Sequence, residues 1–341
     1  MEDTTQNEGL PPAATAGFDS SGHRNPNLPE APPKVTDDAL SRAQWDTLVD
    51  KISRGACTPF LGAGAAFGSL PLGTQLANDL LSDHERRTET KCPLDDRTNL
   101  QAVTQYIAVK RQDTAWAKLQ IKDRIRSYPR PDFRQAGEPH GLMARLPLPI
   151  YLTTNYDDFL FSALKAENRD AQREFSRWTP NLIKKRKSVF DDDYKPTAQR
   201  PVVFHLHGLA EDELQESIVV SEDDYVDFLV SLSRDLARTS RKEILPTTIR
   251  SAITSTSLLF IGYSLKDINF RVLLRGLLGS LQPNGRQLSL TVQYEKDSLG
   301  DLQSYLTEYF EYTFQLNFVN LPAADFCGQL EERCRRAGVI R

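Results

Sequence analysis

Three side chains in this sequence are suited to hydrogen-bonding and proton-transfer chemistry: Asn155, Asp157 and His207. A neutral histidine, with an ordinary pKa of about 6.5, can act as a general base. An asparagine amide can hold water or a sugar hydroxyl because it both donates and accepts hydrogen bonds. Asn155 and Asp157 follow the short apolar run 150–152, so they are expected on a turn from strand to helix. Such residues are also ordinary helix N-caps, and that alternative stays open for this turn alone.

Two glycine-containing turns also follow apolar runs. Gly62-Ala63-Gly64 follows a predicted strand at 57–61, and Gly262-Tyr263-Ser264 follows one at 257–261. Glycines in such turns let the backbone approach a phosphate closely. The complete Gly-x-Gly-x-x-Gly pattern does not occur at Gly62, so a simple tight turn is the alternative interpretation.

The histidine pair His205 and His207 lies in the apolar stretch 201–207, which Gly208 follows. Alternation predicts that both histidines share one face of a strand. A pair of metal ligands is the alternative, but no third or fourth ligand stands at a clear spacing, and we expect no metal. The four cysteines, at 57, 92, 327 and 334, form no Cys-x-x-Cys pair. We interpret His205 as structural and His207 as the candidate base.

The elements that must position these residues alternate between strands and helices. This order predicts an α/β fold with a mainly parallel, doubly wound, Rossmann-like sheet. The stretch of about 75–146 has helical patterns and is too long for a normal crossover, so it is predicted to be a helical insertion that shields the ligand crevice. Further strands are predicted at 217–220, 288–294 and 313–319, and a Ser-capped helix after Ser221. In such a sheet, ligands bind beyond the carboxyl ends of the strands.

Composition limits the class of protein. The chain has 341 residues, 39% hydrophobic and 26% charged, which allows a packed core. A net charge of −4 argues against a general nucleic-acid or membrane-surface binder. The sequence contains neither an apolar run of the roughly 20 residues that span a membrane nor a signal pattern, so a cytoplasmic location is expected. Residues 1–36 are rich in Pro, Gly, Ser and Thr, which predicts a disordered tail before a catalytic domain at 37–341.

Taken in order, the four turns resemble the sirtuin superfamily, and most closely the bacterial sirtuin-like domains of antiphage defence proteins. The matching motifs are Gly-Ala-Gly at 62–64, Thr-Thr-Asn-Tyr-Asp-Asp at 153–158, Leu-His-Gly at 206–208 and Gly-Tyr-Ser-Leu-x-Asp at 262–267, with Glu-Asp-Asp-Tyr at 222–225 in support. The resemblance implies NAD as the ligand. It places Gly62, Ala63 and Gly64 at the pyrophosphate, Asn155 and Asp157 near the nicotinamide ribose and carboxamide, and Gly262 and Ser264 toward the adenosine half. Thr154 and Asn269 complete the predicted binding set, and Asn155 and His207 form the predicted catalytic pair.

The sequence departs from the protein deacylases of this superfamily in two ways. It has no cysteine between His207 and Gly262, so the usual zinc ribbon is not expected. Ala66 and Phe67-Gly68-Ser69-Leu70-Pro71 stand where the deacylases carry a Ser and a Gly-Ile-Pro-x-Phe-Arg segment. Water is therefore expected as the acceptor, which makes an NAD glycohydrolase the main hypothesis.

The resemblance also suggests a biological setting, namely an NAD-depleting effector of antiphage defence by abortive infection. An NAD-dependent deacylase or ADP-ribosyltransferase is the alternative enzyme, and a non-catalytic NAD or ADP-ribose sensor is the alternative binding protein. We expect a homo-oligomer whose contacts include the insertion, with an HerA-like ATPase or another defence protein as partner.

Overall fold

A computed structural model describes residues 40–211, 213–237, 243–264, 268–279, 288–293 and 301–341. The fold lies within the unit Asp38–Arg341. The predicted disordered tail, 1–36, lies outside the described residues, as do residues 265–267 of the last predicted turn.

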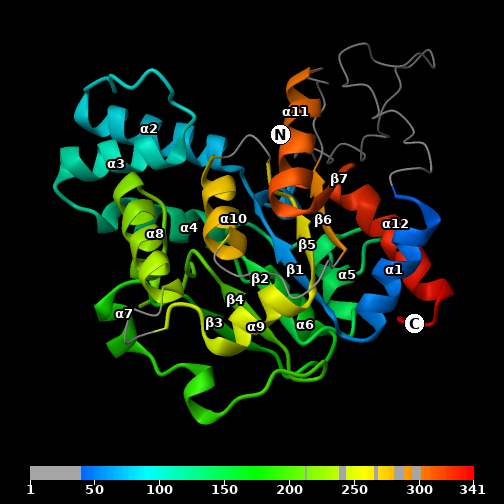
Figure 1. Cartoon of the computed structure of the whole chain (residues 1–341). Coiled ribbons are helices and arrows are strands. Elements are labelled where there is room, and N and C mark those ends of the chain that lie inside the picture. The colour runs from blue at the N-terminus through cyan, green and yellow to red at the C-terminus, as the bar shows by residue number, and fades with distance from the viewer. Residues whose placement is uncertain (1–39, 212, 238–242, 265–267, 280–287, 294–300) are drawn as a thin grey trace, which may run out of the picture. The chain divides into compact units, whose positions relative to one another are not determined.

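The described residues form a seven-stranded sheet with the strand order β3-β4-β2-β1-β5-β6-β7 (Figure 1). Each neighbouring pair is parallel. β1 stands near the middle, and the chain builds outward from it first toward β3 and then toward β7. The strands are β1 (Cys57–Leu61), β2 (Ile150–Thr153), β3 (Gln172–Phe175), β4 (Val202–His205), β5 (Ser257–Ile261), β6 (Ser289–Gln293) and β7 (Leu316–Asn320).

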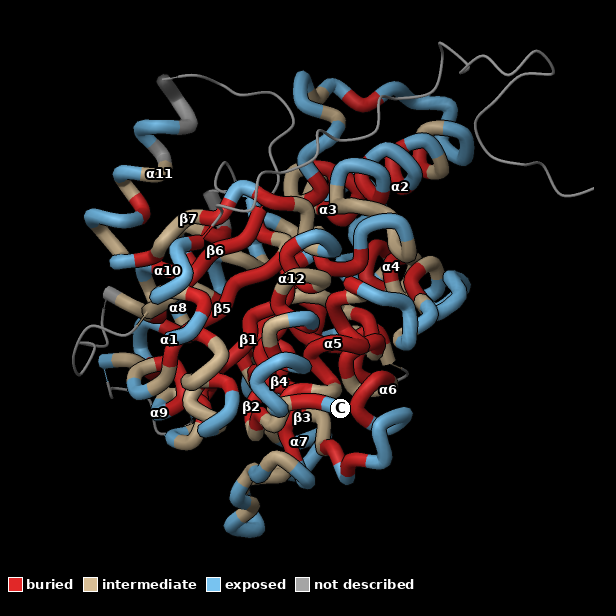
Figure 2. Tube along the Cα trace, turned by 90° about the vertical axis from the view of Figure 1, so that its right-hand side faces the viewer, coloured by how far each residue is buried: buried red, intermediate tan, exposed pale blue. Residues whose placement is uncertain are grey.

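Helices cover both faces of this sheet, and each face has its own apolar core. One core joins the strands to α7 (Pro180–Lys185), α8 (Glu222–Leu236), α9 (Thr247–Ser255), α10 (Ile268–Gly279) and α11 (Asp301–Phe314). The other joins them to α1 (Arg42–Ser53), α5 (Pro139–Arg145), α6 (Phe159–Ala166) and α12 (Ala323–Arg336). Figure 2 shows buried residues along the central strands and exposed ones on the outer surfaces of the helices. The predicted doubly wound, Rossmann-like fold is confirmed.

The predicted helical insertion follows β1, and three of its helices form a separate small core. They are α2 (Gly73–Thr88), α3 (Leu100–Arg111) and α4 (Ala115–Ser127). Their apolar side chains pack against Ala210, Ile218 and Val220, with Tyr156 at the edge. The insertion therefore covers the turns after β2 and β4. The last predicted part of the insertion, α5, instead packs against the sheet with α6 and α12.

Several local predictions were wrong. β4 ends at His205, and His207 lies in the following turn, so the two histidines do not share a strand face. Residues 218–220 are extended but form no strand, because no neighbouring strand pairs with them in the described structure. The sequence also gave no sign of β3, an edge strand of sequence Gln-Arg-Glu-Phe that lacks an apolar run. Three short 3-10 helices, η1 (Ala63–Ala66), η2 (Val189–Asp192) and η3 (Gln215–Ser217), complete the described elements.

Candidate active site

The four predicted turns meet at one edge of the sheet. They leave the adjacent parallel strands β4, β2, β1 and β5, and the last residues of these strands lie in register. His205 pairs with Thr153, Thr153 with Leu61, and Leu61 with Ile261. All four turns therefore begin at the same level, beyond the carboxyl ends of the strands, where ligands bind in sheets of this kind.

The turns after β1 and β5 pack against each other through backbone atoms. The Gly64 N–H donates to the Gly262 carbonyl at 2.9 Å. A Cβ atom at Gly62 would lie 2.8 Å from that same carbonyl oxygen, and one at Gly262 would lie 2.2 Å from the Ala65 nitrogen. Gly262 also has a φ of +79°, which favours glycine. The junction of the two turns therefore requires glycines.

This packing determines which backbone N–H groups of the β1 turn are free to donate to a pyrophosphate. The Gly62 N–H donates to the Ile261 carbonyl at 2.9 Å, and the Gly64 N–H is used as described above. Within the described hydrogen bonds, the Ala63 N–H has no acceptor. The N–H groups of Gly62 and Gly64 are thus used within the junction, while Ala63 is the member of this predicted trio that offers a donor.

Asn155 joins the β2 turn to the β1 turn and to the last residue of β4. Its side-chain Nδ2 donates to the Gly62 carbonyl at 3.1 Å, and its backbone N–H donates to Thr153 Oγ1 at 2.9 Å. Its backbone carbonyl lies 3.1 Å from His205 Nδ1 and accepts from it when that nitrogen is protonated. The Asn155 Oδ1 atom has no donor among the described residues, so it remains able to accept from a ligand.

Tyr263 is a site residue that the sequence analysis did not assign. Its hydroxyl donates to the Leu61 carbonyl at 3.1 Å and lies 3.1 Å from Thr154 Oγ1. Its ring stacks on Phe270 with centroids 4.3 Å apart. Tyr263 therefore joins the β5 turn to the β2 turn and engages predicted residue Thr154. The sequence signal that could have identified Tyr263 as a site residue was its position within the Gly-Tyr-Ser turn.

His207 lies in the turn after β4, between two aromatic rings of α8. Its ring is edge-on to Tyr225 at 5.2 Å and to Phe228 at 5.3 Å between centroids. The residue is 6% exposed, and burial lowers its pKa to about 3. No hydrogen bond to its ring nitrogens occurs among the described residues. His207 is therefore neutral at physiological pH. The Leu-His-Gly motif at 206–208 gave no indication that these two aromatic rings flank it.

The segment Ser217–Ser221, which begins at the last residue of η3 and which we call the strap, holds the His207 turn. Val219 N–H donates to the His207 carbonyl at 3.0 Å. Leu209 N–H donates to Ser217 Oγ at 3.0 Å. Gly208 has a φ of +87°, and a Cβ there would lie 2.2 Å from the Ser217 carbonyl oxygen. The backbone around His207 is thus fixed from the strap side.

The insertion in turn holds the strap and the start of α8. Thr104 Oγ1 on α3 donates to the Val220 carbonyl at 3.1 Å. Lys118 Nζ on α4 lies 2.8 Å from Asp224 Oδ1, and both side chains are largely buried. Asp224 also accepts from the backbone N–H groups of Val220 and Ser221. One buried ion pair therefore links the insertion to the helix that carries the two rings beside His207.

Asp157 lies apart from the junction of the turns. Its Oδ1 accepts from Phe159 N–H at 3.0 Å, so it caps the start of α6. Burial raises its pKa above the ordinary value, and the nearby His140 opposes that shift. Asp157 lines a cavity of about 680 Å³ together with Arg130 and Arg173. Its predicted contact with nicotinamide stays a prediction.

The two remaining predicted residues follow β5. Ser264 is exposed in the turn after the strand. Asn269 is in the first turn of α10, and its side chain lies outside the described structure. Their assignment to the adenosine half of NAD stays a prediction.

The described residues contain neither a cluster of metal-ligating side chains nor a membrane-spanning helix. Among them, no three His, Cys, Asp or Glu side chains are grouped so that they could hold a metal ion. No helix in the described ranges is both long enough and apolar enough to cross a bilayer.

Comparison with known proteins finds similar sequences and a similar domain. Residues 149–313 match the model of the SIR2-like domain. The chain is 24% identical over 242 residues to the NAD(+) hydrolase ThsA of Acinetobacter baumannii (strain 532279), which covers 71% of this chain and 43% of that protein. It is 25% identical over 167 residues to the NAD(+) hydrolase ThsA of Bacillus cereus (strain MSX-D12), covering 49% of this chain and 30% of the relative.

The chain thus spans less than half the length of these curated relatives. A solved structure described as "Structural Basis for the Mechanism and Regulation of Sir2 Enzymes" covers 88% of this chain and 99% of its own, at 10% identity and a TM-score of 0.39. Residues 149–313 are therefore similar to a SIR2-like domain, and the chain is similar over longer ranges to two proteins named NAD(+) hydrolase.

Proposed function

We propose that this protein hydrolyses NAD to nicotinamide and ADP-ribose. One observation carries the proposal. Asn155 and His207 lie on the turns that follow two neighbouring strands whose ends are in register, beside the junction of glycines. Beside the junction, the Ala63 N–H and the Asn155 Oδ1 atom have no partner among the described residues, so both can bind a ligand, and the histidine is neutral. Similarity to two proteins named NAD(+) hydrolase supports the same reaction.

The reaction needs few protein groups. Nicotinamide leaves a cationic ring as a neutral molecule, so the bond from C1′ to the ring nitrogen breaks without a strong acid. The transition state resembles an oxocarbenium ion, as in glycoside cleavage. Water then forms the new bond at C1′, and the electron pair of the broken bond stays on nicotinamide. The protein must orient the ribose and accept one proton from the attacking water.

His207 is proposed as that proton acceptor. A pKa near 3 makes it a weak base toward free water. Water that is bonding to a cationic carbon is far more acidic than free water, so a weak neutral base is sufficient late in the step. Asn155 is proposed to hold the water or a ribose hydroxyl through Oδ1, because its Nδ2 is already tied to Gly62. The proton finally passes to solvent.

The test combines NAD with purified protein and identifies the products by chromatography. We expect nicotinamide and ADP-ribose in equal amounts without added peptide. His207→Ala and Asn155→Ala should each lower the rate by about 100-fold or more, as expected for loss of a positioned base or orienting group. The matched control is His84→Ala, which removes another buried histidine, one that is edge-on to Tyr106 in the insertion. Cleavage near the wild-type rate in either site variant, with circular dichroism showing an intact fold, would remove that residue from the mechanism.

Product analysis also separates the alternatives. Acyl-ADP-ribose formed from an acylated peptide would identify a deacylase, and ADP-ribose attached to a protein would identify a transferase. NAD binding by calorimetry without turnover, under every trigger tried, would favour a sensor.

We further propose that the reaction depletes cytoplasmic NAD during phage infection. The support is the resemblance of the four turns to antiphage sirtuin-like domains. NAD should fall in infected cells that express the wild-type chain and remain high in cells that express Asn155→Ala. An HerA-like ATPase is the first partner to test, by co-purification and by its effect on the NAD cleavage rate.

A further inference from the structure

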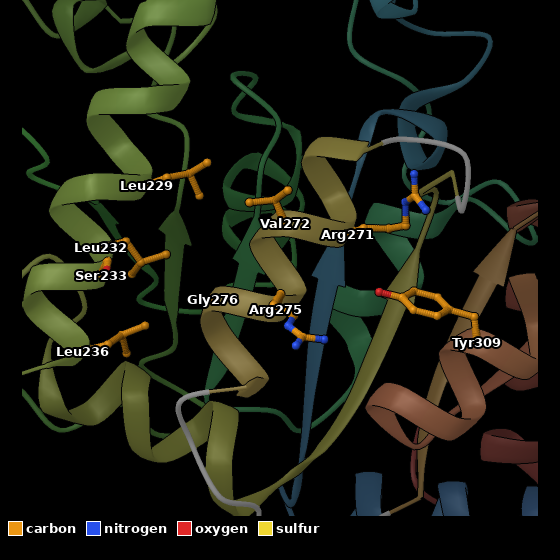
Figure 3. Close-up of a pocket in the computed structure, with 9 residues that line it drawn as sticks. All are labelled: Leu229, Leu232, Ser233, Leu236, Arg271, Val272, Arg275, Gly276 and Tyr309. Atoms are coloured by element: carbon orange, nitrogen blue, oxygen red, sulfur yellow. The ribbon is translucent and has the colours of Figure 1, made fainter.

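An apolar groove lies between α8 and α10 and ends at α11 (Figure 3). Its volume is about 370 Å³. Figure 3 shows the leucines of α8 facing Val272 of α10, with Tyr309 of α11 reaching toward α10 from the far end. The apolar lining residues are Leu229, Leu232, Leu236, Val272, Gly276 and Tyr309. Apolar surface of this kind, open to solvent, marks an interaction site more often than a plain surface does.

Gly276 forms part of the groove although the fold does not require a glycine there. It lies inside α10, where glycine costs about 1 kcal/mol relative to alanine. A Cβ at this position would meet Leu232 Cδ2 at 3.5 Å, an ordinary contact distance. The missing side chain instead deepens the groove.

The charges that line the groove have one sign. Among the described residues, its charged lining residues are Arg271 and Arg275, and none is a carboxylate. Arg275 is exposed, and Arg271 Nε is buried without a hydrogen-bond partner among the described atoms. The groove therefore suits an apolar or aromatic surface that carries acids.

The outer side of α11 has these properties and borders the same groove. Tyr305 is 59% exposed and Tyr312 is 92% exposed. They lie seven residues apart, so both lie on the same side of the helix as Tyr309. Glu308 and Glu311 between them are also exposed. We call Tyr305, Glu308, Glu311 and Tyr312 the α11 stripe.

We propose that two copies of this chain associate with two-fold symmetry, each placing its α11 stripe in the α8–α10 groove of the other. An isologous contact needs the donating and receiving surfaces side by side on one molecule, and Tyr309 makes them continuous here. Tyrosines would fill the leucine-lined groove, and the two glutamates would meet the two arginines. Aromatic residues and arginine are the types enriched in such interfaces. This surface differs from the insertion, and the proposal does not depend on NAD hydrolysis.

A reciprocal charge reversal tests the pairing. Light scattering after size-exclusion chromatography should give a dimer for the whole chain at about 50 μM. The variant R271E/R275E and the variant E308R/E311R should each be monomeric, because each sets like charges against each other. An equimolar mixture of the two should form dimers again, because both contacts of the mixed pair are then complementary. The control R42E/R54E reverses two exposed charges at the two ends of α1 and should remain a dimer.

Gly276→Ala provides an independent test that does not add charge. The folded monomer should be as stable as wild type or more so, while the dimer dissociation constant should rise about tenfold or more because the groove becomes shallower. A monomeric wild-type chain at 50 μM would overturn the proposal. Dimers that persist in both charge-reversal variants, or a mixture that stays monomeric, would also overturn it and indicate a different occupant of the groove.

Discussion

His205 at the end of β4 and His207 in the turn after it should make the stability of this protein fall as the pH falls from 7 to 5. Burial lowers the pKa of His205 to about 4 and that of His207 to about 3. In the unfolded chain both return to an ordinary value of about 6.5. Below that pH the unfolded state binds two protons that the folded state does not bind. Stability contributed by the neutral histidines is therefore complete above pH 6.5 and is lost as the pH falls toward 4 and 3.

The size of this effect follows from proton linkage. Between pH 7 and pH 5, one histidine with these two pKa values lowers the free energy of unfolding by about 2 kcal/mol, and the pair by about 4 kcal/mol. Such a loss is a large fraction of the 5–15 kcal/mol typical of a folded domain. Asp157, whose pKa is raised, contributes with the opposite sign, because its stabilising effect is lost as the pH rises.

Urea unfolding at pH 7 and pH 5 measures this difference directly. The double variant His205→Gln/His207→Gln lacks both titrating groups and keeps Asp157, so the contribution of that carboxyl cancels. The wild type should lose about 4 kcal/mol more than the variant between the two pH values. The comparison uses the change with pH, so an overall loss of stability in the variant does not affect it. Equal pH dependence in both proteins would show that these histidines are not buried in the neutral form.

Two further substitutions test the contacts that position the site. Lys118→Met should lower the free energy of unfolding by about 3 kcal/mol, because it leaves Asp224 buried without its cation. Adding Asp224→Asn should recover part of this loss. If thermal unfolding shows that the destabilising effects of the two single substitutions simply add in the double variant, the ion pair is contradicted. Gly262→Ala should lower the melting temperature strongly, because its Cβ would lie 2.2 Å from the Ala65 nitrogen. Gly68→Ala is its control, with a similar φ of +88° and no atom within 4 Å, so an equal drop in both variants would refute steric exclusion as the cause.

The sequence predicted the four turns and their common edge because each turn follows a local apolar run. The alternation of strands and helices was sufficient to predict a parallel sheet, and a parallel sheet places all these turns at one edge. Local patterns could not distinguish 217–220 from a strand, because pairing depends on a distant neighbour that the segment does not have. They also could not reveal β3, whose position at the sheet edge needs few apolar residues.

Roles that depend on contacts between distant residues were equally hidden. Nothing near His207 in the sequence indicates that Tyr225 and Phe228 flank its ring. The same holds for Lys118, which is 106 residues from its partner Asp224. Asp157 illustrates the opposite case, since local spacing already offered capping as an alternative and the structure shows the capping bond.

The backbone junction of Gly62, Gly64 and Gly262 has a consequence for how proteins of this fold diverge during evolution. Any descendant that keeps the sheet must keep these glycines, because larger residues would separate the two turns. Under the proposed NAD hydrolysis, a descendant that has stopped cleaving NAD is under no such constraint at Asn155 Oδ1 or at the ring of His207. Retained glycines would therefore identify relatives that share the architecture. Replacement of the asparagine or the histidine would identify those that have become binding proteins.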